Sequence, residues 1–267
     1  PNWGTSICFT EAKILDWTLD SVDGDALVVE SYGWSRTKDM LEKGKLGSKK
    51  RCDLRRSDEW FMDYSGVGKV LDKYKVEFLN ITEEQWAHRT MEPETIKDEV
   101  ESIYSPVSDP DFYSWMPQRL YDMRGVDLLS LSKLRIGLSD IPASLSIKNL
   151  FGMIPHPSRW KYHGKKNCIL DTSIFDIYKV YDTIFNIKGV VEAVFTHTDT
   201  DIEHNKMIIK QNLGFAAASK NTLDLDASVM ALCSIEPYQA HVRHASNELG
   251  YWNKQLINEI KQQDPIL

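Results

Sequence analysis

The chain of 267 residues has a formal net charge of −7, with 42% hydrophobic and 27% charged residues. A chain of this length buries a sizeable core without disulfides or structural metals. The acidic balance argues against a general affinity for nucleic acid or anionic membranes, because that binding requires basic side chains that neutralise phosphates. No apolar run approaches the ~18 residues of a membrane-spanning helix. The composition therefore predicts a water-soluble globular protein that binds neither nucleic acid nor membrane.

The four cysteines lie far apart and form no C-x-x-C pair. This spacing excludes the usual zinc-ribbon and ferredoxin ligand sets. Isolated thiols are typical of a reducing compartment, so we expect a cytoplasmic protein. The chain opens at Pro1 without a methionine, and we expect the natural polypeptide to begin earlier.

Helices and short apolar strands alternate through the first half of the chain. Thr10 is a candidate helix cap, and Asp23–Gly24 ends the helix that follows it. The basic stretch 36–56 is predicted to be a long loop or a lid over an anionic substrate. The other expected elements are strands at 26–32, 76–81 and 126–131 and helices around 58–74, 93–104 and 117–124.

The alternation continues in the second half. A helix at 171–186 places Ile174, Tyr178 and Tyr181 on one face, which predicts a well-buried helix. Further along, strands are expected at 189–195 and 213–219. Asn221 is expected to cap the next helix, with Asp224 in a capping box. Two more helices are expected, one with Pro237 in its first turn and one at 251–262. The pattern predicts an α/β fold with a mixed, mostly parallel sheet flanked by helices. It fits a single domain over 1–267 and equally two lobes, 1–142 and 143–267.

Residues 144–155 (SLSIKNLFGMIP) form the most distinctive string in the chain. With the basic run that ends in Tyr162 and His163, this string resembles the family catalogued as domain of unknown function 362, which is often described as iron–sulfur-centre proteins. The resemblance covers nearly the whole chain and implies an α/β fold with a ligand cleft. The other similar stretches, in the family's order, are 1–4, 29–33, 129–134 and 218–227.

The chain departs from the family pattern in three places. The C-terminal cysteine clusters that are frequent in the family are absent, so no iron–sulfur cluster is expected. Ser219 and Asn221 stand where the resemblance implies a glycine and an acid, which weakens a catalytic role for that junction. Segment 197–204 is longer and more polar than the family pattern.

Basic and polar side chains gather in and around the distinctive string. If Ser144 caps a helix, backbone N–H groups and a lysine point to one spot, as anion sites need. If the segment is extended, positions 144, 146 and 148 share one side. Lys133 and Arg135 end a strand, where α/β sheets place ligands. The alternative is a solvated basic loop with Ser144 as an ordinary cap. The predicted ligand-binding residues are Lys133, Arg135, Ser146, Lys148, Asn149 and Arg159.

Segment 197–204 (HTDTDIEH) carries two histidines and two aspartates just past a predicted strand. Neutral imidazole and carboxylate suit divalent cations, and alternation would place positions 197, 199 and 201 on one side. The alternative is a polar loop that faces solvent. The candidate ligands for a divalent metal are His197, Asp199, Asp201 and His204.

Carboxylates at strand and helix ends are candidates for acid–base chemistry. Glu30 lies within an apolar strand, where an acid is costly unless it has a partner. The alternative for Asp224 and Asp226 is that both complement the helix dipole. The predicted catalytic residues are Glu30, His163 and Asp226.

Together these features predict a protein that binds or acts on a small anionic metabolite, a carboxylate or phosphate, at a basic strand-end cleft. The absence of G-x-G-x-x-G, P-loop, G-x-S-x-G and H-E-x-x-H motifs removes the strongest signals for nucleotide binding, hydrolase and zinc-protease chemistry. The alternative is a non-catalytic binding or assembly module, related to redox iron–sulfur proteins but lacking the cluster.

Overall fold

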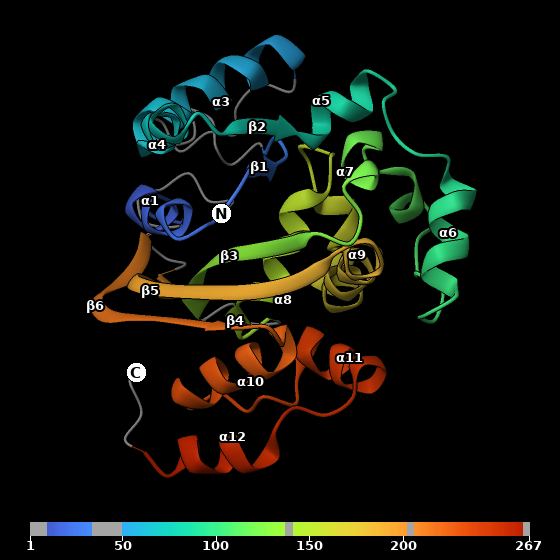
Figure 1. Ribbon diagram of the computed structural model, residues 1–267. Helices are drawn as coiled ribbons and strands as arrows, with labels where there is room; N and C mark the ends of the chain where they lie inside the picture. Colours follow the sequence, from blue (N-terminus) through green and yellow to red (C-terminus); the bar gives the residue numbers. More distant parts are fainter. Residues whose placement is uncertain (1–9, 34–49, 137–140, 202–205, 264–267) are drawn as a thin grey trace.

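The computed structural model describes residues 10–33, 50–136, 141–201 and 206–263. Within these ranges six strands form two sheets, one of two strands and one of four (Figure 1). The expected α/β class is confirmed. The expectation of one mostly parallel sheet is wrong, because the strands divide into two sheets and two of the four pairings are antiparallel.

The smaller sheet pairs β1 (Leu27–Glu30) with β2 (Glu77–Asn80) in parallel. Helices α3 (Arg51–Ser65) and α4 (Val67–Tyr74) connect the two strands. Gly66 separates these helices with a left-handed backbone of φ 77°, where sequence periodicity predicts one helix. Residues 51–56 of the predicted basic loop form the start of α3, while 34–49 lie outside the described residues.

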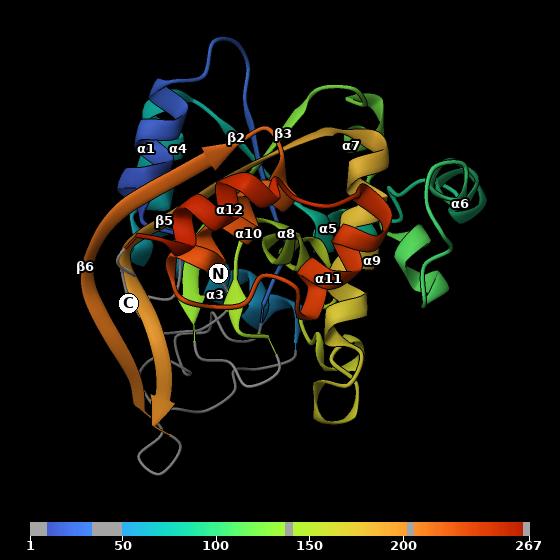
Figure 2. The same cartoon turned by 90° about the horizontal axis from the view of Figure 1, so that it is seen from below.

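The larger sheet has the order β4-β3-β5-β6. Strands β3 and β5 run parallel, while the β3–β4 and β5–β6 pairs are antiparallel. The two strands of the β5–β6 pair extend further towards their connecting turn than the apolar runs in their sequences predict. The reason is that antiparallel pairing depends on backbone groups rather than on apolar side chains. Figure 2 shows β5 and β6 curving beyond the helices. The strands are β3 (Asp127–Ile136), β4 (Ala143–Ser144), β5 (Asn186–Asp201) and β6 (Lys206–Ser219).

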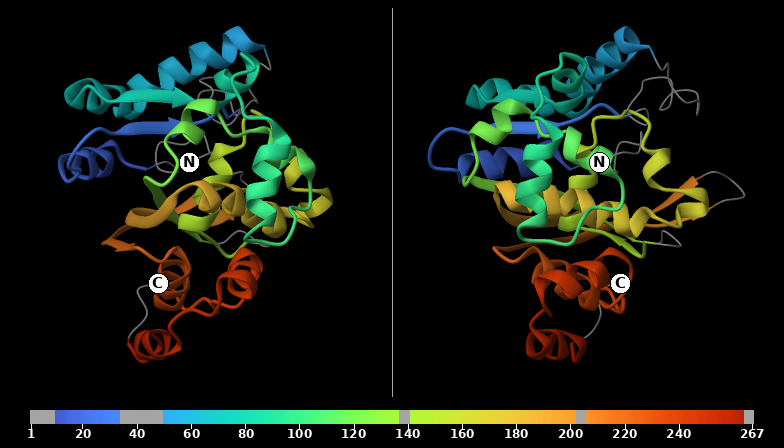
Figure 3. Two further views of the ribbon diagram at one scale, coloured as in Figure 1. Left: turned by 45° about the vertical axis from the view of Figure 1, so that its right-hand side comes forward. Right: turned by 90° about the vertical axis from the view of Figure 1, so that its right-hand side faces the viewer.

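Helices flank both sheets, and the three C-terminal helices form their own layer below the larger sheet (Figures 1 and 3). In this layer α10 packs against β5 and β6. No helix in the described ranges is both long and apolar enough to cross a membrane. The remaining helices are α1 (Ala12–Asp20), α5 (Ile81–Trp86), α6 (Pro93–Glu101), α7 (Gln118–Asp122), α8 (Ser146–Asn149), α9 (Leu170–Ile184), α10 (Thr222–Leu232), α11 (Ala240–Leu249) and α12 (Lys254–Lys261), with 3-10 turns η2 (Pro110–Ser114), η3 (Leu150–Met153), η4 (Trp160–Tyr162) and η5 (Lys165–Asn167).

The predicted caps of the C-terminal helices are partly correct. The Asn221 side chain accepts a hydrogen bond from the Asp224 backbone and so caps α10 as expected. The Asp224 carboxylate does not close a capping box, because it accepts from the Asn253 backbone instead and so joins α10 to the start of α12. Pro237 does not lie in a first helical turn, because α11 begins only after its N-cap, Gln239.

Most of the buried apolar residues form one cluster that runs from Leu79 to Ile257, and α9 contributes eight of its members. Ile174, Tyr178 and Tyr181 are buried in it, as their spacing predicts. A boundary at residue 142 would separate β3 from β4 and β5, its partners in one sheet. The two lobes are therefore not confirmed.

Candidate functional site

Helix α8 lies against β3 and β5 and carries the centre of the distinctive string. The Asn149 amide donates to the Ser130 hydroxyl (3.2 Å) and to the Leu131 carbonyl (3.3 Å), while the Ser130 hydroxyl donates to the Ser146 carbonyl (2.7 Å). On the other side, a Cβ at Gly189 of β5 would lie 2.9 Å from the Ser146 Cβ. The missing side chain of Gly189 thus allows β5 to approach α8 closely, and Asn149 serves to hold the helix.

The start of α8 already binds an anion, and this anion is the carboxylate of Asp226 from α10. Its Oδ1 accepts from the Ser146 backbone (2.9 Å) and hydroxyl (2.6 Å), and its Oδ2 accepts from the Ile147 backbone (2.9 Å). Burial raises the pKa of Asp226 to about 7, although these three hydrogen bonds act in the opposite direction. The N–H groups at the start of α8, which the sequence suggested for binding an external anion, therefore bind a carboxylate of the protein itself. Through these bonds Ser146 and Asp226 join α8 to α10.

Lys148 follows this turn and is half-buried. Its ammonium group makes no hydrogen bond or ion pair with any residue that the structure describes. Burial, and then the positive charge of Arg135, lower the pKa of Lys148 well below its ordinary value. The charge of Lys148 in turn lowers the pKa values of His163 and His241. We call Arg135, Lys148, His163 and His241 the Lys148 cluster.

His241 of α11 is a member that sequence analysis missed. Its side chain is 1% exposed, yet neither ring nitrogen has a hydrogen-bond partner among the residues that the structure describes. Its Nε2 lies 4.0 Å from Oδ2 of Asp226. Burial, followed by the charge of Lys148, lowers its pKa to about 3, so the ring is neutral at physiological pH. A single histidine on an amphipathic helix carries no local signal that separates a buried position from an exposed one.

His163 packs against the rings of Phe151 and Trp160, with centroid distances of 5.5 and 5.3 Å. Its Nδ1 is 2.9 Å from Oδ1 of Asn167. Because an amide oxygen accepts, Nδ1 carries the proton and Nε2 keeps a lone pair. Burial lowers the pKa of His163, and the charges of Lys148 and Arg159 add to this effect.

Two other predicted site residues, Lys133 and Arg159, have partners of their own. Lys133 lies 2.8 Å from Glu192 and 3.2 Å from Glu11, so two carboxylates offset its charge. Arg159 donates to the Ser31 hydroxyl (2.8 Å) and the Gly152 carbonyl (2.9 Å).

The carboxylate of Glu30 lies against Gly152, where an added Cβ would come 2.7 Å from its Oε1. Glu30 thus approaches the segment at η3, whereas Asp226 binds the start of α8. Of the three predicted catalytic residues, His163 alone belongs to the Lys148 cluster.

The predicted metal segment differs from expectation in its backbone. His197, Asp199 and Asp201 lie within β5, paired with β6, rather than in a loop past a strand. The register shifts between His197 and Asp199, so simple alternation does not continue across these positions. His204 and the side chains of the other three lie outside the described residues. Elsewhere in the described part of the chain, no group of three or more histidine, cysteine or acidic side chains is placed to hold a metal.

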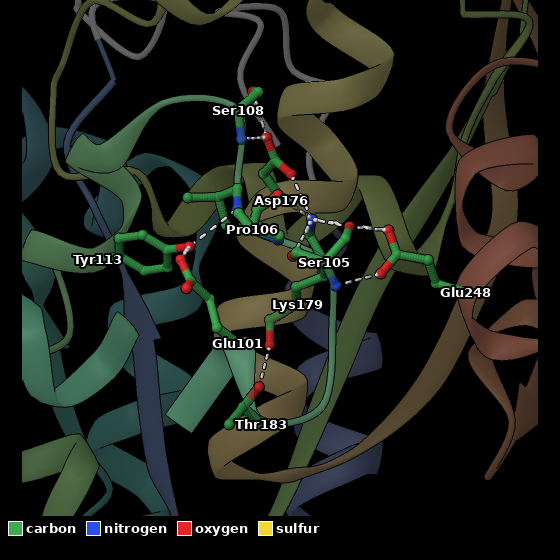
Figure 4. Close-up of polar contacts among 10 residues, drawn as sticks. Glu101, Ser105, Pro106, Ser108, Tyr113, Asp176, Lys179, Thr183 and Glu248 are labelled. Atoms are coloured by element: carbon green, nitrogen blue, oxygen red, sulfur yellow. Dashed lines mark hydrogen bonds and ion pairs between the residues drawn. The ribbon is translucent and has the colours of Figure 1, made fainter. Parts of the chain in front are cut away.

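A second buried charge cluster surrounds Lys179 of α9 (Figure 4). Its ammonium group lies 3.0 Å from Asp176 and donates to the Ser105 and Pro106 carbonyls at 3.1 and 3.2 Å. The other oxygen of Asp176 accepts from the Ser108 backbone at 2.8 Å. These bonds satisfy both charges and hold the loop 105–108 on α9, so the cluster is structural.

Comparison with known protein families finds a match over part of the chain. A family model described as domain of unknown function (DUF362) matches residues 137–231. No curated protein and no solved structure matches the chain significantly. The matched stretch includes Lys148, His163 and Asp226 and ends before His241. Over residues 137–231 the chain is similar to the DUF362 family.

Proposed function

We propose that this protein binds a small anionic ligand, a carboxylate or phosphate, at the Lys148 cluster. The observation that carries the proposal is the ammonium group of Lys148, which has no counter-ion among the described residues. Burying a cation without a partner is costly, and such groups concentrate at functional sites. A bound anion would offset both the loss of hydration and the repulsion from Arg135.

Three other buried cations in the described part of the chain have fixed partners that the structure shows. Lys133 lies between two carboxylates, and Lys179 has a carboxylate and two carbonyls. Arg159 donates to a hydroxyl and a carbonyl. Fixed partners of this kind offset the charge of the side chain without a bound ligand. Lys148 is the residue for which a ligand would supply the partner.

The experiment compares thermal unfolding of the protein in phosphate, acetate and citrate with unfolding in chloride at equal ionic strength. We expect at least one of these anions to raise the Tm of the wild type. The Lys148→Met variant should lose this increase. The matched control is Lys97→Met, which removes the same charge from an exposed position on α6. Anion stabilisation that Lys148→Met retains, or that the wild type lacks for every anion, would contradict the proposal.

A further inference from the structure

We propose that an extended peptide with a lysine or arginine side chain binds along β2, where it adds a strand to the smaller sheet. The inference is based on a pocket of about 730 Å³ that lies beside β2 and is bordered by α5, the turn after it and α7 (Figure 1). We call it the β2 pocket, and its lining consists of residues 77–80, 83–84, 88–90, 118–119 and 122. It shares no residue with the Lys148 cluster, so the inference goes beyond the proposed function and does not rest on it.

The first support is the second edge of β2. All four residues of the strand line the pocket, and because side chains alternate between the faces of a strand, such a pocket reaches the backbone itself. β2 pairs with β1 on one edge, and no described strand pairs with the other. No backbone hydrogen bond joins residues 77–79 to a described residue outside this pair. The N–H and C=O groups that point away from β1 are therefore open to an incoming strand.

The second support is the form of the pocket. β2 has four residues, which span about 13 Å of extended chain. Residues of α5 and α7 border this short edge, so a single extended chain fits beside it, whereas the edge of a second folded sheet would meet the two helices. The form therefore favours a peptide over a second copy of the protein. Addition of a peptide strand to a sheet edge is a general mode of recognition, in which backbone hydrogen bonds give the affinity.

The third support is the charge of the lining, which carries four carboxylates and two guanidinium groups. Three of the carboxylates are each bound by a guanidinium group, in the pairs Arg119–Glu77, Arg89–Glu84 and Arg55–Glu83. The fourth, Asp122, accepts a hydrogen bond from the neutral amide of Gln118 (2.9 Å) and has no cationic partner among the described residues. A lysine or arginine of the peptide is the partner that complements this carboxylate.

The probes are fluorescein-labelled hexapeptide amides of alternating valine and threonine, one set with lysine at each position in turn and a matched set with glutamate. Fluorescence polarisation measures their binding to the whole protein. We expect at least one lysine peptide to bind, at least about threefold more tightly than its glutamate counterpart. N-methylation of one alternate set of backbone nitrogens should abolish this binding, because only one edge of the peptide faces β2. The inference fails if no lysine peptide binds, if the glutamate peptides bind equally well, or if neither alternate set of N-methyl groups weakens binding.

Two further measurements locate the bound peptide. Asp122→Asn removes an exposed carboxylate from the pocket and should weaken binding of the lysine peptide about three- to tenfold. The matched control is Asp98→Asn, which removes the same charge from an exposed position on α6 and should leave binding unchanged. Bound peptide should also slow hydrogen exchange at residues 77–79. Equal effects of the two variants, or slower exchange in β4 or β6 without a change in β2, would overturn the inference.

Discussion

At the scale of single residues, Lys148 and Asp226 show opposite solutions to burial of a charge. The carboxylate of Asp226 is fully buried and accepts three hydrogen bonds from one helical turn. The ammonium group of Lys148, two residues further along the same helix, has no such partner in the described structure. The first arrangement stabilises the fold locally, whereas the second is a cost that the folded protein tolerates.

Replacing Lys148 by methionine should therefore stabilise the protein while it removes anion binding. The pKa of Lys148 is lowered in the folded state, so as pH falls below about 10.4 the unfolded chain takes up a proton that the folded chain does not. The wild type loses stability over that interval, and the methionine variant does not. We expect a gain of about 1 kcal/mol at pH 7, or roughly 2–4 °C in Tm.

Thermal unfolding between pH 7 and pH 10.5 measures this difference. The advantage of Lys148→Met should shrink as the pH approaches the ordinary lysine pKa. A variant that is less stable than the wild type at pH 7 would show that Lys148 has a favourable partner.

At the scale of elements, the close approach of β5 to α8 depends on Gly189. An added Cβ would lie 2.6 Å from Cδ2 of Leu225 and 2.9 Å from both the Cβ and Oγ of Ser146. Gly189→Ala should force β5 away from α8 and α10 and cost about 1–3 kcal/mol. Urea unfolding measures the loss. Gly68→Ala is the control, because a Cβ in α4 would meet its nearest atom at 3.4 Å, and it should leave stability unchanged or raise it.

The loop 105–108 depends on α9 through the buried pair of Lys179 and Asp176, whose side chains are 3% and 2% exposed. Lys179→Met leaves the Asp176 carboxylate buried without its cation, and we expect a loss of about 3–5 kcal/mol in unfolding free energy. Lys188→Met removes a lysine from the exposed pair with Asp127 and should cost less than about 1 kcal/mol. Equal losses in chemical denaturation of the two variants would show that burial does not set the strength of the Lys179 pair.

Sequence periodicity located the elements with a regular apolar pattern, such as β1, β2 and α9. It missed the lengths of β5 and β6, because the hairpin continues by backbone pairing into polar sequence. It also did not separate α8 from β4, since elements of four and two residues have no periodicity to detect.

For the site, too, the sequence revealed local patterns but not the contacts between distant residues. The distinctive string indicated the similarity to the DUF362 family and drew attention to Lys148, but residues far apart in sequence decide what each side chain does. Asp226 binds a turn 79 and 80 residues away, and His241 joins the cluster from a helix outside the family match. Charge patterns alone placed Lys133 and Arg159 with Lys148, although the first is paired to Glu192 and the second binds Ser31.

At the scale of the whole molecule, segment 152–159 is hydrogen-bonded to residues that directly follow the strands of the smaller sheet. The Ser31 hydroxyl, just after β1, lies 2.5 Å from the Gly152 carbonyl and 2.6 Å from that of Ile154. The Thr82 hydroxyl of α5 donates to the Pro155 carbonyl (2.7 Å). Arg159 completes the junction through its bonds to Ser31 and Gly152.

Loss of Arg159 should loosen the smaller sheet rather than the segment alone. Arg159→Met removes the charged donor that binds both the Ser31 hydroxyl and the Gly152 carbonyl in this buried junction, and we expect a loss of about 3 kcal/mol. Hydrogen exchange should become faster in β1 and β2 as well as around 152–159. Faster exchange confined to 152–159 would show that the junction does not hold the sheet.

This junction also has a consequence for synthesis of the chain. The bonded atoms of Ser31 and Gly152 belong to residues 121 positions apart. At about 5–20 residues per second, a ribosome needs roughly 6–24 s to add that length. β1 is made just before that interval and β2 (Glu77–Asn80) during it, before the segment that fastens them exists. The smaller sheet therefore remains incomplete, with apolar surface exposed, during the period in which chaperones bind the nascent polypeptide.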